Sequence, residues 1–340
     1  MWSLDILALD GLTTTVTDAT FKAARLTWAL DGSGAAEIEL TAADALAGAW
    51  LYGRRRVLIK DSLDVAQFQG WLDRLERRGA PGKVQYRASA RGLAAILEQR
   101  VVHGDFNKVS VVATTIARDL IAHMVAQTND MTGFTAGTHT GAVSPARDRW
   151  YCDGDNIREM IDELAELSNG FTWEIDAAGA FNTWAGQRGT DLTGSVTLRP
   201  EDVQDWSFIG DMEEFATYAT GVGEDPDGPC GPPALTDYTA DRTAYGRREA
   251  VIGVDTASEA ELLEAITEEL RARAASGKNL RVAWIEGRGP WAFGDVWLGD
   301  TVNVELGPEF GGDADMRLIN VSISLEPGTL EFVELEWEAA

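Results

Sequence analysis

Alternating apolar and polar residues near the C-terminus constrain the fold most, because a period of two belongs to β-strands. Apolar side chains occupy alternate positions within residues 317–325 and again within residues 330–337. These segments predict two neighbouring strands, each with one buried face. Further strands are expected at 280–285 and 301–306. The C-terminal part is therefore expected to form a sheet.

The first hundred residues contain a second β-rich region. Strands are predicted at 56–60, 67–74 and 83–90, which are short and rich in Val, Ile, Phe, Trp and Tyr. Gly and Pro interrupt them at residues 79–82, and residues 92–99 are expected to form a short helix. This pattern is typical of a β-barrel or a β-sandwich.

A helix-rich section separates the two β-rich regions. Apolar residues recur three and four apart between Ala113 and Met124, which predicts a helix that Ser110 caps. A second helix is expected from about Asn156, with Asp155 as its cap. The expected order along the chain is therefore a sheet, a helix-rich insert and a second sheet.

The remaining segments complete this organisation. A strand at 171–175 is expected to form a hairpin with 180–184, and a helix is expected at 259–275. Residues 223–235 contain four of the ten prolines, which predicts a linker or a long surface loop. A chain of 340 residues exceeds the roughly 250–300 residues that one core usually serves, so two or three domains are expected.

Charge is distributed unevenly along the chain. The formal net charge of −26 disfavours tight nucleic-acid binding and fits either a soluble outer surface or an acidic channel. Residues 51–100 nevertheless hold eleven Lys or Arg against five Asp or Glu, whereas residues 301–340 hold nine Asp or Glu against Arg317 alone. This predicts an interface between the basic stretch and an acidic surface, including another copy's C-terminal segment. The residues expected there are Arg54, Arg55, Arg56, Arg74, Arg77 and Arg78.

The sequence contains no recognised catalytic, phosphate-binding or metal-binding motif. No GxSxG, Walker A, GxGxxG or HExxH pattern occurs. The three histidines lack metal-ligand spacing, and His123 is expected in a partly buried structural role on a helix. Cys152 and Cys230 lie far apart, and both are expected to be reduced thiols. We therefore expect no catalytic residue, cofactor or metal.

The many acidic and aromatic residues leave carbohydrate binding or hydrolysis open as an alternative function. DGDN at 153–156 lacks the third oxygen ligand and the glycine of a calcium loop, and GGDAD at 311–315 is expected to be a turn. A carboxylate pair for glycoside hydrolysis is compatible with 55 acidic residues, and twelve tryptophans are compatible with sugar stacking. Packing in a core or an interface is the expected use of most of these tryptophans.

Three stretches together carry a resemblance to a known family. They are FQGWLDRLERRG with YRASARGLAAILEQRVV; WYCDGDNIREMIDELAELSNGFTWEID; and YGRREAVI followed by GDVWLGDTVNVELGPEFGGDADMRLINVSISLEPGTLEFVELEWE. In this order and spacing the chain resembles the hub proteins of phage tail tips. These are minor tail or tail-associated proteins of long-tailed phages, akin to the baseplate hubs of contractile tails.

The resemblance implies an α+β, β-rich fold with two β-barrel-like domains and α/β insertions. Residues 1–104 with 190–222 would form the first barrel, 105–189 the insert, and 223–340 a helix with the second barrel. It also implies a structural subunit. Some family members continue into a peptidase or lysozyme domain, whereas this sequence stops at Ala340 just after the last expected strand, so the protein is not expected to be an enzyme.

The expected location is the tail tip of the virion, after synthesis in the host cytoplasm. Three copies would form a ring that joins the hexameric tail tube, or the distal tail protein, to a central fibre or spike. Contact with the tape measure protein is expected, and DNA would pass without specific binding. No membrane span is expected. The alternative function is an acidic cell-wall carbohydrate-binding protein or hydrolase of the tail tip.

Overall fold

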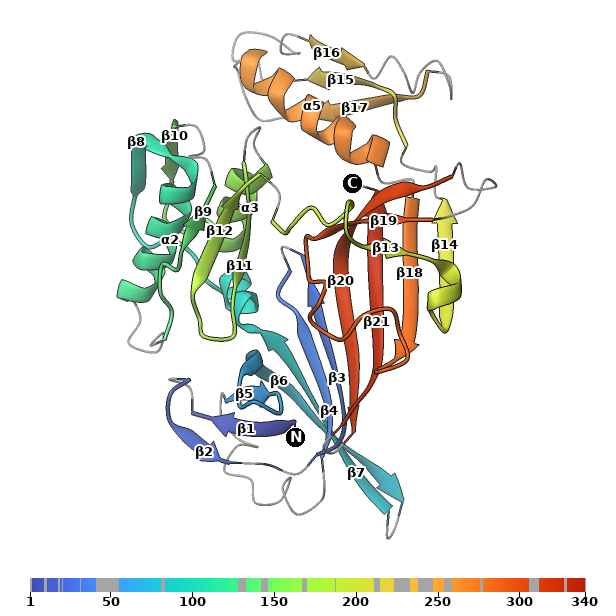
Figure 1. The fold of residues 1–340 in the computed structure, drawn as a ribbon. Helices are drawn as coiled ribbons and strands as arrows, with labels where there is room; N and C mark the ends of the chain where they lie inside the picture. The colour runs from blue at the N-terminus through green and yellow to red at the C-terminus, as the bar shows by residue number, and fades with distance from the viewer. Residues whose placement is uncertain are drawn as a thin grey trace.

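The computed structural model is β-rich, with helices grouped in two places (Figure 1). It describes residues 2–8, 11–17, 19, 21–30, 32–40, 55–80, 83–127, 133–141, 146–166, 170–186, 188–210, 215–222, 233–237, 247–253, 259–275, 278–305, 312–326 and 329–339.

Among these residues, thirteen strands join into one large sheet that contains both ends of the chain. Its N-terminal strands are β1 (Ser3–Leu7), β2 (Thr14–Val16), β3 (Phe21–Ala29), β4 (Ala35–Leu40), β5 (Arg56–Lys60), β6 (Ala66–Ala80) and β7 (Lys83–Gly92). Its C-terminal strands are β13 (Thr197–Leu198), β14 (Asp205–Gly210), β18 (Lys278–Ile285), β19 (Thr301–Val304), β20 (Ala314–Glu326) and β21 (Thr329–Ala339). The main path runs β14-β18-β21-β20-β3-β4-β7-β6-β5-β1-β2.

The two β-rich regions meet where β3 pairs with β20. The pairing is antiparallel and runs from Asn320 opposite Ala29 to Leu325 opposite Ala24. The predicted alternation of β20 holds from Val321 to Leu325, whose apolar side chains lie in the core with Ser322 on the opposite face. It fails at Ile319, where the register shifts and the side chain is only half-buried. The β-rich fold is thus confirmed, and the two regions form one continuous sheet. Among the described strands, no pairing closes this sheet into a barrel.

One hydrophobic core lies beneath both halves of this sheet. It contains residues from the first strand, Leu4 and Ile6, and from the last, Leu335 and Trp337. Trp337 and Trp284 are among the largest side chains that are fully buried. Burial of apolar area on this scale is the main driving force for keeping the two ends of the chain together.

The insert has its own core. Its elements are the 3₁₀ helix η2 (Leu93–Gln99), β8 (Phe106–Val112), α2 (Ala113–Gln127), β9 (His139–Thr140), β10 (Ala146–Tyr151), α3 (Ile157–Glu166), β11 (Phe171–Ile175) and β12 (Phe181–Ala185). Apolar side chains of α2, α3 and β11–β12 pack around Trp173 and Phe181. This second core also contains Trp71 of β6 and residues of η2, so it reaches beyond the predicted insert at 105–189, whose boundaries stay a prediction.

Both predicted caps of the insert helices need correction. Ser110 lies in β8 with a φ of 54°, and α2 begins only at Ala113. The cap of α3 is Asn156, whose Oδ1 accepts hydrogen bonds from the backbone N–H of Arg158 (2.9 Å) and Glu159 (3.3 Å). Asp155 instead accepts a bond from the Cys152 backbone N–H at 2.7 Å.

A third, smaller unit contains β15 (Tyr218–Val222), β16 (Pro233–Asp237), β17 (Glu249–Gly253) and α5 (Glu259–Ala275). β15 lies between β16 and β17, and Ile266 and Leu262 of α5 pack against the sheet. The bounds of α5 match the prediction, whereas most of the predicted 223–235 loop lies outside the described residues. A short 3₁₀ helix, η3 (Pro200–Asp202), precedes β14.

Residues 190–222 were predicted to form one barrel with residues 1–104. Their strands instead pair with strands of the C-terminal part of the chain. β13 pairs with β19, and β14 pairs with β18, so both belong with the C-terminal strands. β15 belongs to the third unit. Pairing between strands that are far apart in the chain has no local signal, which explains the difference. Where the domain boundaries fall stays a prediction.

Candidate assembly surface

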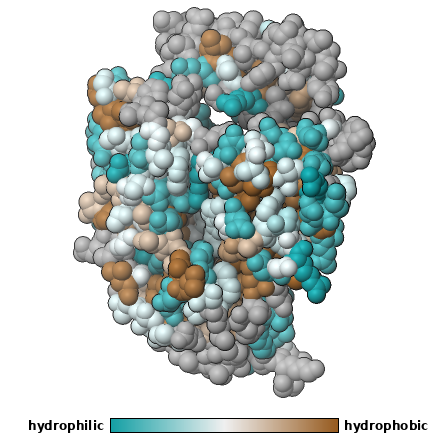
Figure 2. Space-filling model, in the orientation of Figure 1, coloured by the Kyte–Doolittle hydropathy of each residue, from teal (hydrophilic) through white to brown (hydrophobic). Residues whose placement is uncertain are grey.

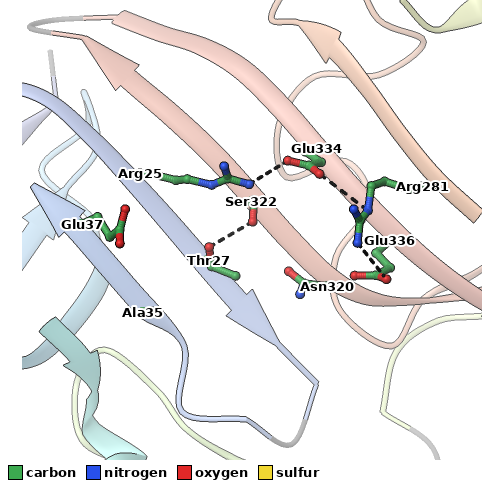
Figure 3. A pocket seen from close by; sticks show the side chains of 9 residues that line it. All are labelled: Arg25, Thr27, Ala35, Glu37, Arg281, Asn320, Ser322, Glu334 and Glu336. Atoms are coloured by element: carbon green, nitrogen blue, oxygen red, sulfur yellow. Dashed lines mark hydrogen bonds and ion pairs between the residues drawn. The ribbon is translucent and has the colours of Figure 1, made fainter. Parts of the chain in front are cut away.

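We call the line along which β3 pairs with β20 the seam between the two β-rich regions. A polar groove crosses this seam (Figure 3). It encloses about 440 Å³ on the face of the large sheet opposite the core. Its lining residues come from β3, β4, β18, β20 and β21, and they are Arg25, Thr27, Ala35, Glu37, Arg281, Asn320, Ser322, Glu334 and Glu336. Side chains alternate between the two faces of a sheet along each strand. The groove residues share one face, and the residues that alternate with them point to the other face, into the core.

Ion pairs tie the strands of the groove together. Arg25 Nη2 lies 2.8 Å from Glu334 Oε2, so a charge pair spans from β3 to β21 across β20. Arg281 contacts Glu334 at 3.7 Å and Glu336 at 3.3 Å. Beneath these pairs the hydroxyls of Thr27 and Ser322 lie 3.0 Å apart. The groove is therefore a set of cross-strand polar contacts, the kind that fixes strand register.

The carboxylates of the groove are held by arginine. Glu37 pairs with Arg87 of β7, and Glu334 and Glu336 pair with the arginines named above. Carboxylates that neutralise cations in this way suit structural use, whereas acid–base catalysis needs one carboxyl group held in its protonated form. The arrangement gives no support to the glycoside hydrolase alternative.

An aromatic cluster, which the sequence analysis missed, also joins the two β-rich regions. We define it as Trp2, Trp28, Phe293 and Trp297, of which the last two lie between β18 and β19. The ring centroids of Trp28 and Trp297 are 5.4 Å apart, and those of Trp2 and Phe293 are 6.2 Å apart. Trp28 Nε1 donates a hydrogen bond to the Gln67 carbonyl at 3.1 Å. Its only sequence signal is the aromatic spacing in WAFGDVW.

Three of the predicted interface residues lie exposed on β6. The side chains of Arg74 and Arg78 are each 68% exposed, and Arg77 is also exposed. Arg78 Nε lies 2.6 Å from Glu76 Oε1, and this hydrogen bond holds the pKa of Glu76 below its usual range. Their role at an interface stays a prediction.

The other three predicted interface residues are not gathered with them. Arg56 is only 2% exposed, and its guanidinium lies 4.3 Å from the centre of the Trp71 ring and 5.5 Å from that of Phe134. A side chain buried in this way cannot contact another copy, so we remove Arg56 from the expected set. Arg55 is half-buried, and Arg54 lies outside the described residues.

The remaining predictions concern histidine, cysteine, metals and the membrane. His123 is half-buried with its ring 5.5 Å from that of Phe106. Cys152 is an exposed free thiol, and Cys230 lies outside the described residues.

Within the described ranges, His, Cys, Asp and Glu form no group of three or more that could hold a metal. None of the helices described here is both long and apolar enough to cross a membrane.

Several solved structures share this fold. A tail protein from Neisseria meningitidis MC58 is 15% identical, with 99% of this chain and 96% of that chain covered at a TM-score of 0.72. The 43 kDa tail protein of prophage MuSo2 from Shewanella oneidensis is 15% identical, with 99% and 98% covered at a TM-score of 0.73. At these identities the likeness concerns the fold.

A third structure also shares this fold. The E. coli c3393 protein is a component of the type VI secretion system and is structurally similar to the T4 tail proteins gp27 and gp5. It is 10% identical, with 95% of this chain and 74% of that chain covered at a TM-score of 0.53. No curated protein matches the sequence.

The family comparison agrees with the fold and covers nearly the whole chain. The model described as Siphovirus ReqiPepy6 Gp37-like protein matches residues 11–337. That span includes the large sheet from β2 onward, the insert and the third unit. The chain therefore belongs to the Siphovirus ReqiPepy6 Gp37-like family of phage tail proteins.

Proposed function

We propose that this protein is a structural subunit of the tail-tip hub, and that three copies form a ring between the tail tube and a central fibre or spike. The observation that carries the proposal is the continuous sheet, in which two antiparallel β-regions meet at β3 and β20. Three chains would present six such regions, the number that a six-fold tube meets. A closed ring of this kind needs two different contact surfaces on each chain.

Rigidity supports a role as an adaptor. The shared core, the ion pairs of the groove and the aromatic cluster all cross the seam, so the two β-regions behave as one body. A rigid body holds the two β-regions at a fixed angle, which a ring with defined symmetry requires. The arginine-held carboxylates support a structural rather than an enzymatic role.

The proposed neighbours follow from this place in the tail. On one side the ring would contact the tail tube or the distal tail protein, and on the other a fibre or spike, with the tape measure protein inside. Three chains carry −78 formal charges, three times the −26 of one chain. That excess supports passage of DNA without specific binding, because like charges repel at short range.

The oligomeric state tests this proposal. The mass of one chain is 36.8 kDa, so multi-angle light scattering of the purified protein should give about 110 kDa at micromolar concentration. Dilution should produce a single step from trimer to monomer. A mass near 37 kDa at every concentration, or a stable dimer, would contradict the ring.

A further inference from the structure

One hairpin extends beyond the rest of the large sheet. β6 pairs with β5 only as far as Trp71, and β7 pairs with β4 only from Tyr86 onward. Between these limits β6 and β7 pair with each other, as in Arg78 opposite Gln85. We call residues 74–85 the arm. Figure 1 shows the end of this hairpin projecting past the other described strands.

Among the described residues, the end of the arm pairs with no third strand. Isolated two-stranded hairpins are marginally stable in water, and strands with open edges readily accept further partners. Closer to the rest of the sheet, Leu75 packs partly against the main core, and the Arg77 guanidinium lies 6.0 Å from the centre of the Tyr86 ring. A long hairpin of this kind is expected to gain order from a contact outside its own chain.

The arm is positively charged, whereas the chain as a whole is negatively charged. The arm holds four Lys or Arg against Glu76 alone, in a protein whose net charge is −26. Glu76 is shared, since Arg78 lies 2.6 Å and Arg74 3.7 Å from the same carboxylate oxygen. Each guanidinium carries five N–H donors, so one shared carboxylate leaves most of these donors available to a partner.

We propose that the arm docks on surface carboxylates of a neighbouring copy and forms one of the two contacts that close the ring. This inference rests on the proposed function, since it requires copies that meet. A second copy fits the arm because it supplies an acidic surface at high local concentration. DNA fits less well, because the acidic remainder of the chain repels phosphate.

The surface of the chain agrees with a contact guided by charge. Figure 2 shows hydrophobic residues in separate spots on the coloured part of the visible face, with hydrophilic residues between them. Large apolar interfaces appear as broad exposed patches. Scattered apolar spots between hydrophilic residues are typical of a polar interface, in which complementary charge sets orientation and partner.

Charge reversal of the arm tests the proposal. The double variant Arg77→Glu/Arg78→Glu should raise the midpoint concentration of trimer assembly by at least roughly tenfold, because like charges then face each other. A matched control is Arg271→Glu/Arg288→Glu, which changes the net charge equally at two other exposed arginines. This control should shift the midpoint by less than about threefold. Equal shifts in the two double variants would overturn the inference.

A chemical cross-link identifies the partner directly. The variant Arg77→Lys/Arg78→Lys keeps the charge and adds amines that a carbodiimide couples to nearby carboxylates. In trimers mixed from ¹⁴N- and ¹⁵N-labelled chains, mass spectrometry should find links from these lysines to Asp or Glu of a differently labelled chain. Links confined to one chain would overturn the arm contact while leaving the ring intact.

Two further outcomes separate this inference from the proposed function. A monomeric wild-type chain would overturn both. A short DNA duplex that binds the wild type and loses that binding in Arg77→Glu/Arg78→Glu, with assembly unchanged, would assign the arm to nucleic acid and overturn the inference alone. Circular dichroism should show that every variant keeps the fold, since the changed side chains are exposed.

Discussion

Replacing Trp337 with Ala is expected to lower the free energy of unfolding by about 3–5 kcal/mol, the usual cost of removing a large buried aromatic side chain. Trp337 is 0% exposed and belongs to the core that both halves of the sheet share. Its ring lies 6.4 Å from that of Trp291, in the segment between β18 and β19. The resulting cavity would weaken the packing of β21 and of that segment together.

Denaturant unfolding followed by circular dichroism measures this loss, at one protein concentration because assembly shifts apparent stability. Trp337→Phe fills more of the space and should cost less than the alanine change. The control is Trp150→Ala, the same change at a side chain that is 61% exposed, which should cost under about 1 kcal/mol. Similar losses at Trp337 and Trp150 would contradict the shared core.

Replacing Gly92 with Ala should destabilise the protein by about 3 kcal/mol or prevent its soluble expression, because the new methyl group has no room. Gly92 lies where β7 ends and η2 begins, and its N–H donates to the Gly34 carbonyl at 3.1 Å. A Cβ at this position would lie 1.6 Å from the Ser33 carbonyl oxygen. The turn between β3 and β4 would have to move away from β7.

Gly194→Ala is the matched control for Gly92→Ala. A Cβ at Gly194 would meet no atom within 4 Å. The added methyl group there should change the free energy of unfolding by less than about 1 kcal/mol, or stabilise the fold by restricting the unfolded chain. Thermal unfolding of the two variants side by side measures the difference. Equal midpoints would show that the β3–β4 turn is not packed against β7 as described.

Local elements could be predicted from the sequence because their signals are local. The strands at 56–60 and 171–175 and the helix at 259–275 have the predicted bounds, since periodicity and flanking turn residues mark them. The pairing of β3 with β20 joins residues almost 300 positions apart, and no local pattern encodes it. The single continuous sheet was therefore beyond sequence reasoning, although both of its halves were expected.

The candidate surface, like the fold, could be predicted only where the signal is local in the sequence. Counting charges located the basic stretch, and Arg74, Arg77 and Arg78 are indeed exposed. The same count could not show that Arg56 is buried, because its covering rings come from β6 and from Phe134 of the insert. Similarly, Trp28 and Trp297 meet only after folding, so the aromatic cluster had no signal beyond the aromatic spacing in WAFGDVW.

A cryo-electron microscopy reconstruction of the intact tail tip tests the hub assignment most directly. The central claim is that three copies of this chain surround the tail axis between the tube and the fibre or spike. The reconstruction should fit three copies with threefold symmetry at that level, with each large sheet placed as one rigid body. Six copies around the axis, a single copy, or density only on the outer side of the tail would contradict the account.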